Sequence, residues 1–272
     1  MSVLPPVLYL RPSTLEEAVR ALDRPGAVPL AGGTDLLVAL QRPGEHQDRP
    51  PLLVDIKGIA EAQGIRQTAS GLRIGALATA AQLAGDPLVW AEAAALAEAA
   101  RATAAPALRR RATLGGNLCT PHPAGDVATA LVALGAEVEI AGRDGRRTVD
   151  VEAFLSRRDR ALQPGELVLA ALIPGGQRSA FEKFGSRLAF SRALVAAAVA
   201  RRNEGLRVAL GGVGPRPLRA RHAEDAVGRG GPLEDAVVRD CVPPDDETAS
   251  RWYRLRLAGV LVRRCLEMLE GG

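Results

Sequence analysis

Two pairs of adjacent glycines carry the clearest chemistry in this sequence. The first glycine segment comprises Ala31, Gly32, Gly33, Thr34, Asp35 and Leu36, and the second glycine segment comprises Thr113, Leu114, Gly115, Gly116 and Asn117. Glycine lets the backbone turn through positive φ and approach a ligand closely, so that backbone N–H groups form a concave anion site. Thr34 and Asn117 add side-chain donors, and Asp35 can accept from a hydroxyl or an amide. Two such segments facing each other would suit the pyrophosphate of a dinucleotide.

Each segment also has a purely structural interpretation. Neither matches the GxGxxG pattern of a Rossmann fold or the lysine-containing phosphate loop of P-loop proteins. A glycine pair between a strand and a helix is most often a plain tight connection. The presence of two pairs, each beside polar side chains that a ligand would use, gives binding equal weight with the structural role. On the residues alone, both interpretations stay open.

The elements around the first glycine segment follow from helix and strand signals. Ser13 and Thr14 each have a glutamate three residues later, which is the capping-box spacing at a helix start. The short apolar run over 28–31 predicts a strand, and a short helix is predicted over 36–40. The first glycine segment therefore lies between a strand and a helix.

The second glycine segment is flanked by helices. Alanine and leucine predict a helix across about 88–102. Asp126 is placed to cap a further helix that runs to Leu134. Strands or hairpins are predicted over 52–55, 64–75, 136–149 and 167–173.

The chain beyond Pro174-Gly175-Gly176 predicts a second unit. Strand-like segments are predicted over 181–186, 194–201 and 206–211. A strongly amphipathic helix over 252–269 closes the sequence. No long-period repeat is present.

Composition excludes several classes of function. The chain has 272 residues, and with 47% of them hydrophobic it can bury a core, which excludes a disordered protein. Its three cysteines are far apart in sequence, which excludes a disulfide framework or a cysteine-cluster metal site. The arginines are scattered among acidic residues, against a nucleic-acid surface. No stretch reaches the roughly 18 apolar residues of a membrane span, and the first residues do not resemble a signal peptide, so a cytoplasmic protein is expected.

Five segments, in order along the chain, resemble the medium, flavin-binding subunit of the molybdenum hydroxylases, a family that covers carbon monoxide dehydrogenase, bacterial xanthine dehydrogenase and their relatives. The two glycine segments look like its two loops around the FAD pyrophosphate. The stretch over 121–126 is similar to its SPxxD stretch, 211–220 resembles its GGVxPxPxRA segment, and 253–264 resembles its closing helix. The resemblance spans nearly the whole chain, and the combination is specific.

The resemblance implies an α+β fold. It places a vanillyl-alcohol-oxidase-type (PCMH) FAD-binding domain over 1–174, in two subdomains of about 1–57 and 58–174. A C-terminal flavoprotein domain of the carbon monoxide dehydrogenase type, with an antiparallel sheet and helices, then covers 175–272.

The resemblance also assigns residues to the cofactor. It implies that both glycine segments cradle the FAD pyrophosphate, that Asp126 holds ribityl or nucleotide hydroxyls, and that Leu169 and Lys183 line the flavin pocket. Lys183 is one of only two lysines in the chain. A cation beside the isoalloxazine would stabilise the reduced, anionic flavin, whereas the ordinary alternative is a solvated strand lysine. The segment over 186–191 lacks the tyrosine that some relatives place by the flavin ring, and no catalytic residue or metal ligand is predicted.

The implied function is electron transfer through FAD. A large subunit with the molybdenum cofactor and a small subunit with [2Fe-2S] centres would be partners, in a dimer of heterotrimers, with NAD⁺ or another acceptor receiving the electrons. Some reductases of the family carry a further four-cysteine cluster in this subunit, and three cysteines cannot supply one. The alternatives are a stand-alone flavin oxidoreductase of the same fold and a non-enzymatic scaffold that has lost FAD.

Overall fold

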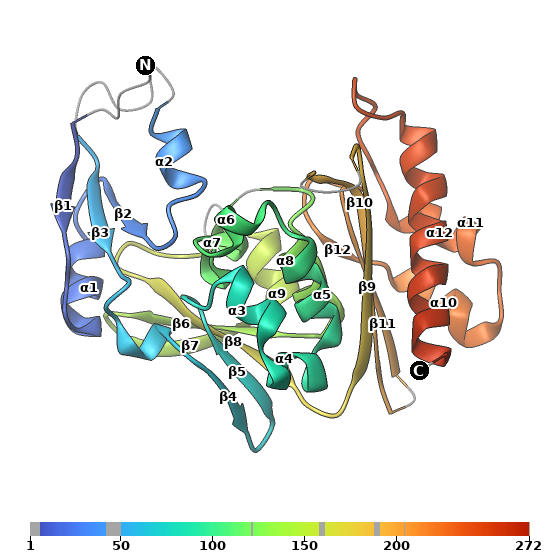
Figure 1. The fold of residues 1–272 in the computed structure, drawn as a ribbon, viewed down its shortest axis with the longest axis horizontal. Helices are drawn as coiled ribbons and strands as arrows, with labels where there is room; N and C mark the ends of the chain where they lie inside the picture. The colour runs from blue at the N-terminus through green and yellow to red at the C-terminus, as the bar shows by residue number, and fades with distance from the viewer. Residues whose placement is uncertain are drawn as a thin grey trace.

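The computed structural model describes residues 6–41, 50–120, 122–157, 161–187, 191–203 and 205–271. Three sheets follow one another along the longest axis of the molecule (Figure 1). A small parallel sheet lies at one end, a mixed layer of helices and an antiparallel sheet lies in the middle, and a second antiparallel sheet covered by helices lies at the other end. The chain therefore builds its layers in sequence order.

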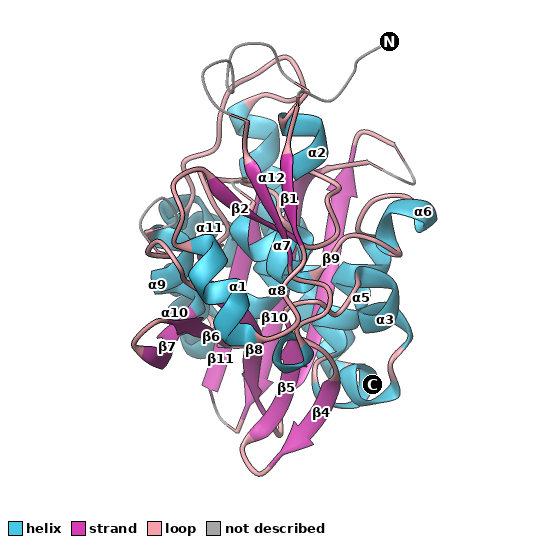
Figure 2. Ribbon diagram, turned by 90° about the vertical axis from the view of Figure 1, so that its left-hand side faces the viewer, coloured by secondary structure: helices cyan, strands magenta, loops and turns pink. Residues whose placement is uncertain are grey.

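The N-terminal sheet has three parallel strands in the order β1-β3-β2. Its elements are β1 (Leu8–Leu10), α1 (Leu15–Leu22), β2 (Ala27–Leu30), α2 (Leu36–Ala39) and β3 (Leu52–Asp55). The helix expected after Thr14 is confirmed, since the Thr14 hydroxyl accepts from the Glu17 N–H. Figure 2 looks onto this end of the molecule, with α1 and the strands facing the viewer.

The central sheet has five antiparallel strands in the order β4-β5-β8-β6-β7. The strands are β4 (Ile65–Thr68), β5 (Gly71–Gly75), β6 (Glu137–Gly142), β7 (Gly145–Asp150) and β8 (Leu167–Pro174). The helical segments of this layer are η1 (Ala60–Ala62), α3 (Ala80–Gly85), α4 (Pro87–Glu92), α5 (Ala94–Ala102), α6 (Pro106–Arg109), α7 (Leu114–Cys119), α8 (Asp126–Ala133) and α9 (Val151–Ser156). All the hairpins and strands expected here are confirmed.

The prediction of a single helix across 88–102 is wrong. The structure has two helices there, and Ala93 between them is not helical, with φ −152° and ψ 53°. Nothing in the local sequence signals this break, because alanine favours a continuous helix. Ala93 is fully buried and α5 packs on both α8 and β9, so tertiary packing sets the direction of the second helix.

The C-terminal sheet has four antiparallel strands in the order β12-β11-β10-β9. Its elements are β9 (Arg178–Gly185), β10 (Ala193–Arg202), β11 (Gly205–Gly211), β12 (Leu218–Arg219), α10 (Arg221–Arg229), α11 (Leu233–Asp240) and α12 (Arg251–Glu270). Helix α12 lies along the outer face of this sheet (Figure 1). The strands and the long closing helix expected from the sequence are confirmed, whereas α10 and α11 were not anticipated.

Strand β10 shows why the two units share a core. Its side chains alternate between the two faces of the sheet, as the period of a strand requires. Ala196 and Ala198 join the cluster formed with α5 and α8, and Val195 and Val199 join the cluster under α12. Small side chains on the inner face let the central helices pack closely against this sheet. A single apolar core therefore continues across the expected boundary near Pro174.

The capping box at Thr79 offers a local test of stability. The Thr79 hydroxyl accepts from the Gln82 N–H at 3.2 Å, and the Thr79 N–H donates to the Gln82 side chain at 2.8 Å. We expect Thr79→Ala to lower the free energy of unfolding by about 1 kcal/mol, measured by urea denaturation. Ser156→Ala, which removes an exposed hydroxyl at the end of α9, is the control and should change it little. Equal losses in the two variants would contradict the capping role.

Candidate functional site

The first glycine segment turns the chain from β2 into α2. Gly33 has φ +73°, in the left-handed region that favours glycine. Among the described residues, no acceptor is found for the backbone N–H groups of Gly32, Gly33 and Thr34, and all three residues are only partly buried. The Thr34 hydroxyl lies 3.5 Å from the exposed Asp35 carboxylate. This turn therefore presents unpaired donors to its surroundings, as an anion site requires.

The flanks of this segment anchor it to the fold. Ala31 packs against the buried cluster beneath α1, and Leu36 begins α2. Leu37 donates its N–H to the Gly33 carbonyl, which closes the first turn at 3.1 Å. The free donors are therefore held between two ordered elements.

The two glycine segments meet at Gly32. A Cβ atom at this position would lie 1.9 Å from the Arg111 carbonyl oxygen, so only glycine allows the approach. The Arg111 guanidinium also lies 3.4 Å from the Gly32 carbonyl. Arg111 and Ala112 directly precede the second glycine segment, and this contact therefore brings the two segments together. Arg111 was not predicted as a site residue, because it stands in a run of three arginines and no motif distinguishes it from the other two.

The second glycine segment is a helix start and not an open turn. Thr113 caps α7, accepting from the Gly116 N–H through its hydroxyl at 3.1 Å and from the Asn117 N–H through its carbonyl at 2.9 Å. The Gly115 N–H donates to the Ala76 carbonyl at 2.8 Å. The expectation of free N–H groups at these three residues is therefore wrong. The cap at Thr113 and the turn after β5 accept those donors instead.

Close packing explains the glycine at 115. A Cβ atom there would lie 2.8 Å from the Ala76 side chain. Leu114 and Gly115 are buried, whereas Gly116 and Asn117 are partly exposed. The partly exposed side of the segment is therefore its second half.

Asn117 caps the next helix from outside. The Asn117 side-chain oxygen accepts from the Ala128 N–H at 3.0 Å, within the first turn of α8. The residue at the cap position itself is Gly125, which has no side chain to do this, and Asp126 is the first helical residue. The expectation that Asp126 caps α8 is therefore wrong by one position. Asn117 takes the capping role, and the Asp126 carboxylate is left for another partner.

Asp126 is a buried carboxylate whose two oxygens differ in their hydrogen bonding to the described residues. Lys183 Nζ lies 2.7 Å from Asp126 Oδ2. The Thr103 hydroxyl lies 3.3 Å from the same oxygen. Asp126 Oδ1 is also buried, and it has no hydrogen-bond partner among the described residues. Burial raises the pKa of Asp126 to about 6, and Lys183 and Thr103 offset only part of this effect.

Lys183 has all three of its N–H donors in use. Nζ contacts the Asp126 carboxylate, the Ala102 carbonyl at 2.5 Å and the Ser191 carbonyl at 3.2 Å. The side chain is 14% exposed, so it is not a solvated strand lysine. The interpretation as a solvated strand lysine is therefore wrong, whereas the expected position in the flavin pocket stays a prediction. The carbonyl partners of Lys183 were not predicted because carbonyls leave no side-chain signal.

Leu169 lies in the core. Its side chain is fully buried with Ile59 and Val54 in the cluster beneath α1. Its carbonyl accepts from the Ala76 N–H at 2.8 Å, which holds the turn after β5 whose carbonyl binds Gly115. The side chain of Leu169 therefore packs in the core, and the expected position at the wall of a flavin pocket stays a prediction.

The buried Asp126 predicts a pH dependence of stability. A carboxyl group with a pKa of about 6 when folded and near 3.8 when unfolded takes up its proton first in the folded state, so stability rises as the pH falls through this interval. The complete difference corresponds to about 3 kcal/mol. We expect the stability of the wild type to rise relative to that of Asp126→Asn between about pH 7 and pH 5, measured by urea unfolding. A relative stability that stays level or falls would contradict this result.

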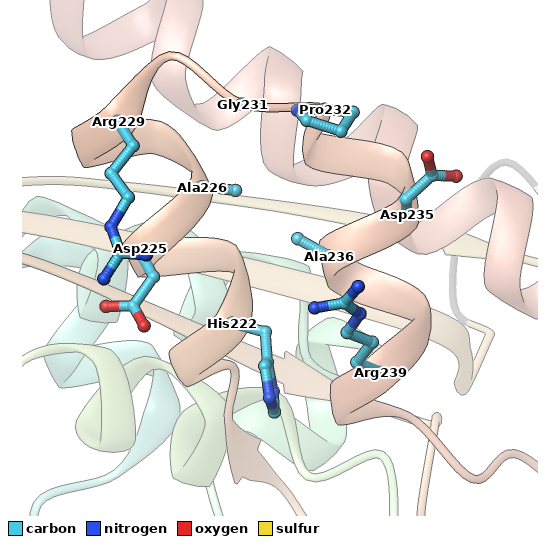
Figure 3. Close-up of a pocket in the computed structure, with 9 residues that line it drawn as sticks. All are labelled: His222, Asp225, Ala226, Arg229, Gly231, Pro232, Asp235, Ala236 and Arg239. Carbon is cyan, nitrogen blue, oxygen red and sulfur yellow. The ribbon is translucent and has the colours of Figure 1, made fainter.

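A surface hollow elsewhere does not belong to this site. Helices α10 and α11 enclose about 230 Å³ between them (Figure 3). His222 at its edge lies 2.8 Å from Asp240, which also accepts the Ala223 N–H at the start of α10. None of the predicted site residues lines it.

The thiols, the possible metal ligands and the helices of the described residues add three observations. Burial raises the pKa of both Cys241 and Cys265, and Cys119 is exposed. No group of three histidine, cysteine, aspartate or glutamate side chains in the described ranges is arranged to hold a metal ion. Within the same ranges, every helix is too short or too polar to cross a bilayer.

The comparisons with known proteins cover nearly the whole chain. A family model described as the FAD binding domain in molybdopterin dehydrogenase matches residues 5–176, and one described as the CO dehydrogenase flavoprotein C-terminal domain matches 180–269. The xanthine dehydrogenase FAD-binding subunit of Escherichia coli O157:H7 is 33% identical over 278 residues, covering 95% of this chain and 94% of the relative. The carbon monoxide dehydrogenase medium chain of Hydrogenophaga pseudoflava is 32% identical over 276 residues, covering 95% of each.

Solved structures confirm the fold class. Carbon monoxide dehydrogenase from Hydrogenophaga pseudoflava, in a form that lacks the Mo-pyranopterin moiety, matches with a TM-score of 0.88 and 31% identity over 97% of each chain. Quinoline 2-oxidoreductase from Pseudomonas putida 86 matches with a TM-score of 0.86 and 29% identity over 99% of each chain. The expected α+β fold, with an FAD-binding domain and a C-terminal domain, is confirmed. The chain belongs to the FAD-binding medium subunits of the molybdenum hydroxylases, the oxidoreductase family of xanthine dehydrogenase and carbon monoxide dehydrogenase.

Proposed function

We propose that this chain holds one FAD and passes electrons from the [2Fe-2S] centres of a small partner subunit to NAD⁺ or another acceptor, while a large molybdopterin-binding subunit oxidises the substrate. When bound, FAD accepts electrons singly or as a pair and so joins one-electron to two-electron chemistry. The chain itself supplies placement and electrostatics. No residue of the chain is proposed as an acid, a base or a nucleophile.

The residues present fit a dinucleotide. The observation that carries the proposal is the set of N–H groups at Gly32, Gly33 and Thr34 for which the described part of the chain provides no acceptor. These groups lie at a turn whose neighbour approaches too closely for any Cβ atom at Gly32. These donors would hold a pyrophosphate oxygen. Asp126 Oδ1, which none of the described residues contacts by a hydrogen bond, would accept from a cofactor hydroxyl. Gly116 and Asn117, on the partly exposed side of the second glycine segment, would complete the wall of the site.

The domain division supports the same assignment. We propose that the FAD-binding unit covers 1–174, with subdomains of about 1–57 and 58–174, and that the C-terminal unit covers 175–272. Strand β8, which ends at Pro174, and the next strand β9 belong to different sheets. The pyrophosphate residues would then come from both subdomains, since the first glycine segment follows β2 and the second begins α7.

Reconstitution with FAD tests the proposal. The full chain, purified with any subunits that co-elute, should bind FAD in a one-to-one ratio, measured by absorption after gel filtration. Protein that carries no flavin under these conditions would overturn the proposal and favour the scaffold alternative.

The assembly state separates the subunit from a stand-alone flavoenzyme. We expect co-elution with a large and a small subunit on size exclusion of a native extract, in a dimer of heterotrimers, and bleaching of the flavin by electrons from the partners. A chain that elutes alone and turns over a substrate with its own flavin would be a stand-alone oxidoreductase instead. The cytoplasmic location expected from the sequence stays a prediction.

A further inference from the structure

The contact between Asp126 and Lys183 joins two separate units of the chain. Asp126 begins α8 in the central layer, whereas Lys183 lies on β9 of the C-terminal sheet. Lys183 Nζ also binds the carbonyl of Ala102 at the end of α5, and the carbonyl of Ser191 ahead of β10. The ammonium group is therefore fixed from three directions, and its position does not depend on Asp126 alone.

The two oxygens of Asp126 have different environments. Lys183 donates to Oδ2 at 2.7 Å. The Thr103 hydroxyl has one proton to donate, and it lies 2.8 Å from the Ala99 carbonyl and 3.3 Å from Asp126 Oδ2. Lys183 is thus the principal donor that orients the carboxylate. Within the residues that the structure describes, Oδ1 is a buried acceptor without a hydrogen-bond partner. A buried acceptor of this kind is satisfied by a donor from a ligand or a water molecule.

We propose that Lys183 is a positioning residue for the cofactor, holding Asp126 so that Oδ1 accepts a hydroxyl of the FAD ribityl chain or ribose. This inference rests on the proposed function. It makes retention of FAD depend on a residue of the C-terminal unit, which lies outside the FAD-binding unit. It also replaces a direct contact between the lysine and the flavin ring by an indirect role.

The surroundings of the pair make the role specific. Lys183 is the charged side chain in contact with Asp126 within the described ranges. The Glu98 carboxylate on α5 accepts a hydrogen bond from the Phe181 N–H. The Arg109 guanidinium on α6 donates to the carbonyls of Thr103 and Ala104. These neighbouring charges have partners of their own. Loss of Lys183 therefore leaves Asp126 without a counter-ion.

Titration of FAD into four proteins tests the proposal. The proteins are the wild type, Lys183→Met, Asp126→Asn and the double variant, each the full chain with any co-eluting subunits. Each single variant should weaken FAD binding by about tenfold to a hundredfold, the usual effect of losing one hydrogen bond to a charged group. The double variant should be no weaker than the weaker single variant, because both residues act through one acceptor. Lys57→Met, at the other lysine of the chain, is the matched control and should bind as the wild type does.

The pH profile separates positioning from mere structural support. Wild-type affinity should fall as the pH drops below about 6, because Asp126 then carries a proton. Lys183→Met should move this fall to higher pH, because the carboxylate loses its counter-ion, and Asp126→Asn should abolish it.

Where Lys183→Met does not fold, Asp126→Leu/Lys183→Met replaces the pair by apolar side chains, and it should fold but bind FAD as weakly as Asp126→Asn.

The outcomes distinguish the proposal from its alternatives. Single variants that bind FAD like the wild type, or a double variant whose losses add, would overturn it. An altered flavin spectrum in Lys183→Met but not in Asp126→Asn would also overturn it and favour a direct lysine–ring contact. A wild type without FAD would instead overturn the proposed function.

Titrations with FMN and ADP identify the hydroxyl that Asp126 binds. Asp126→Asn should weaken the binding of FMN if the hydroxyl is on the ribityl chain, and the binding of ADP if it is on the ribose. An effect on neither ligand would count against the contact.

Discussion

Gly32→Ala is expected to weaken FAD binding by at least about a hundredfold, which corresponds to about 2.7 kcal/mol of binding free energy. The alanine Cβ would lie 1.9 Å from the Arg111 carbonyl oxygen, a backbone atom that cannot move aside by a rotamer change. The first glycine segment must therefore shift away from the second. Donors aimed at one pyrophosphate would then be misplaced relative to each other, and misplacement of about 1 Å at a preorganised site is costly.

The measurement is FAD affinity by fluorescence titration, together with thermal unfolding to confirm that the variant is folded. Gly85→Ala is a matched control, because a Cβ there has open space around it and no positive φ is involved. It should leave FAD affinity unchanged. A folded Gly32→Ala protein with wild-type affinity would show that the contact between the two segments does not shape the cofactor site.

Gly212→Ala is expected to destabilise the chain by about 3–5 kcal/mol, in the range reserved for named structural defects. Gly212 has φ +77°, and a Cβ there would lie 2.2 Å from the Leu194 carbonyl oxygen. Its N–H donates to the Pro123 carbonyl at 2.8 Å. The residue therefore fastens the start of the C-terminal segment over 211–220 to the loop that leads into Asp126. Strain and a backbone clash would both act at this junction.

Gly230→Ala is the control for the conformational part of this effect. Gly230 has φ +66° at the end of α10, but a Cβ there meets nothing within 4 Å. Its substitution should cost about 1 kcal/mol, the usual strain of a non-glycine residue in this region. Urea denaturation of both variants measures the difference. Similar losses would mean that φ alone explains the glycine at 212 and that the close approach to Leu194 is unimportant.

The local sequence was informative where short-range physics decides the outcome. The capping signal at Thr14, the strands or hairpins over 64–75 and 136–149, and the amphipathic closing helix were all predicted and are confirmed. These features depend on residues a few positions apart, so their signals are complete within the segment itself. The family could be identified from the residues for a related reason, since its motifs occur in the same order along the whole chain.

Competition between distant groups explains the errors. The second glycine segment was predicted as a turn with free N–H groups. In the structure the Ala76 carbonyl accepts the Gly115 N–H, and Thr113 accepts the next two N–H groups at the start of α7. Asp126 was predicted to cap α8, but the Asn117 side chain accepts the N–H of Ala128 in the first turn of that helix instead. In each case the sequence contained the correct functional groups. Which acceptor each donor would find depended on elements far away along the chain.

Lys183 shows most clearly what the sequence determined and what the tertiary structure decided. Its rarity in an arginine-rich chain marked it as a residue of interest, and the sequence alone determined that a cation stands just after the boundary near Pro174. Only the tertiary structure decided that this cation is buried, saturated by three acceptors and aimed at Asp126. The physical reason is that charge and residue type are local properties, whereas burial and pairing are set by the packing of one unit on another. The types and order of the site residues were therefore determined by the sequence, and their roles by the fold.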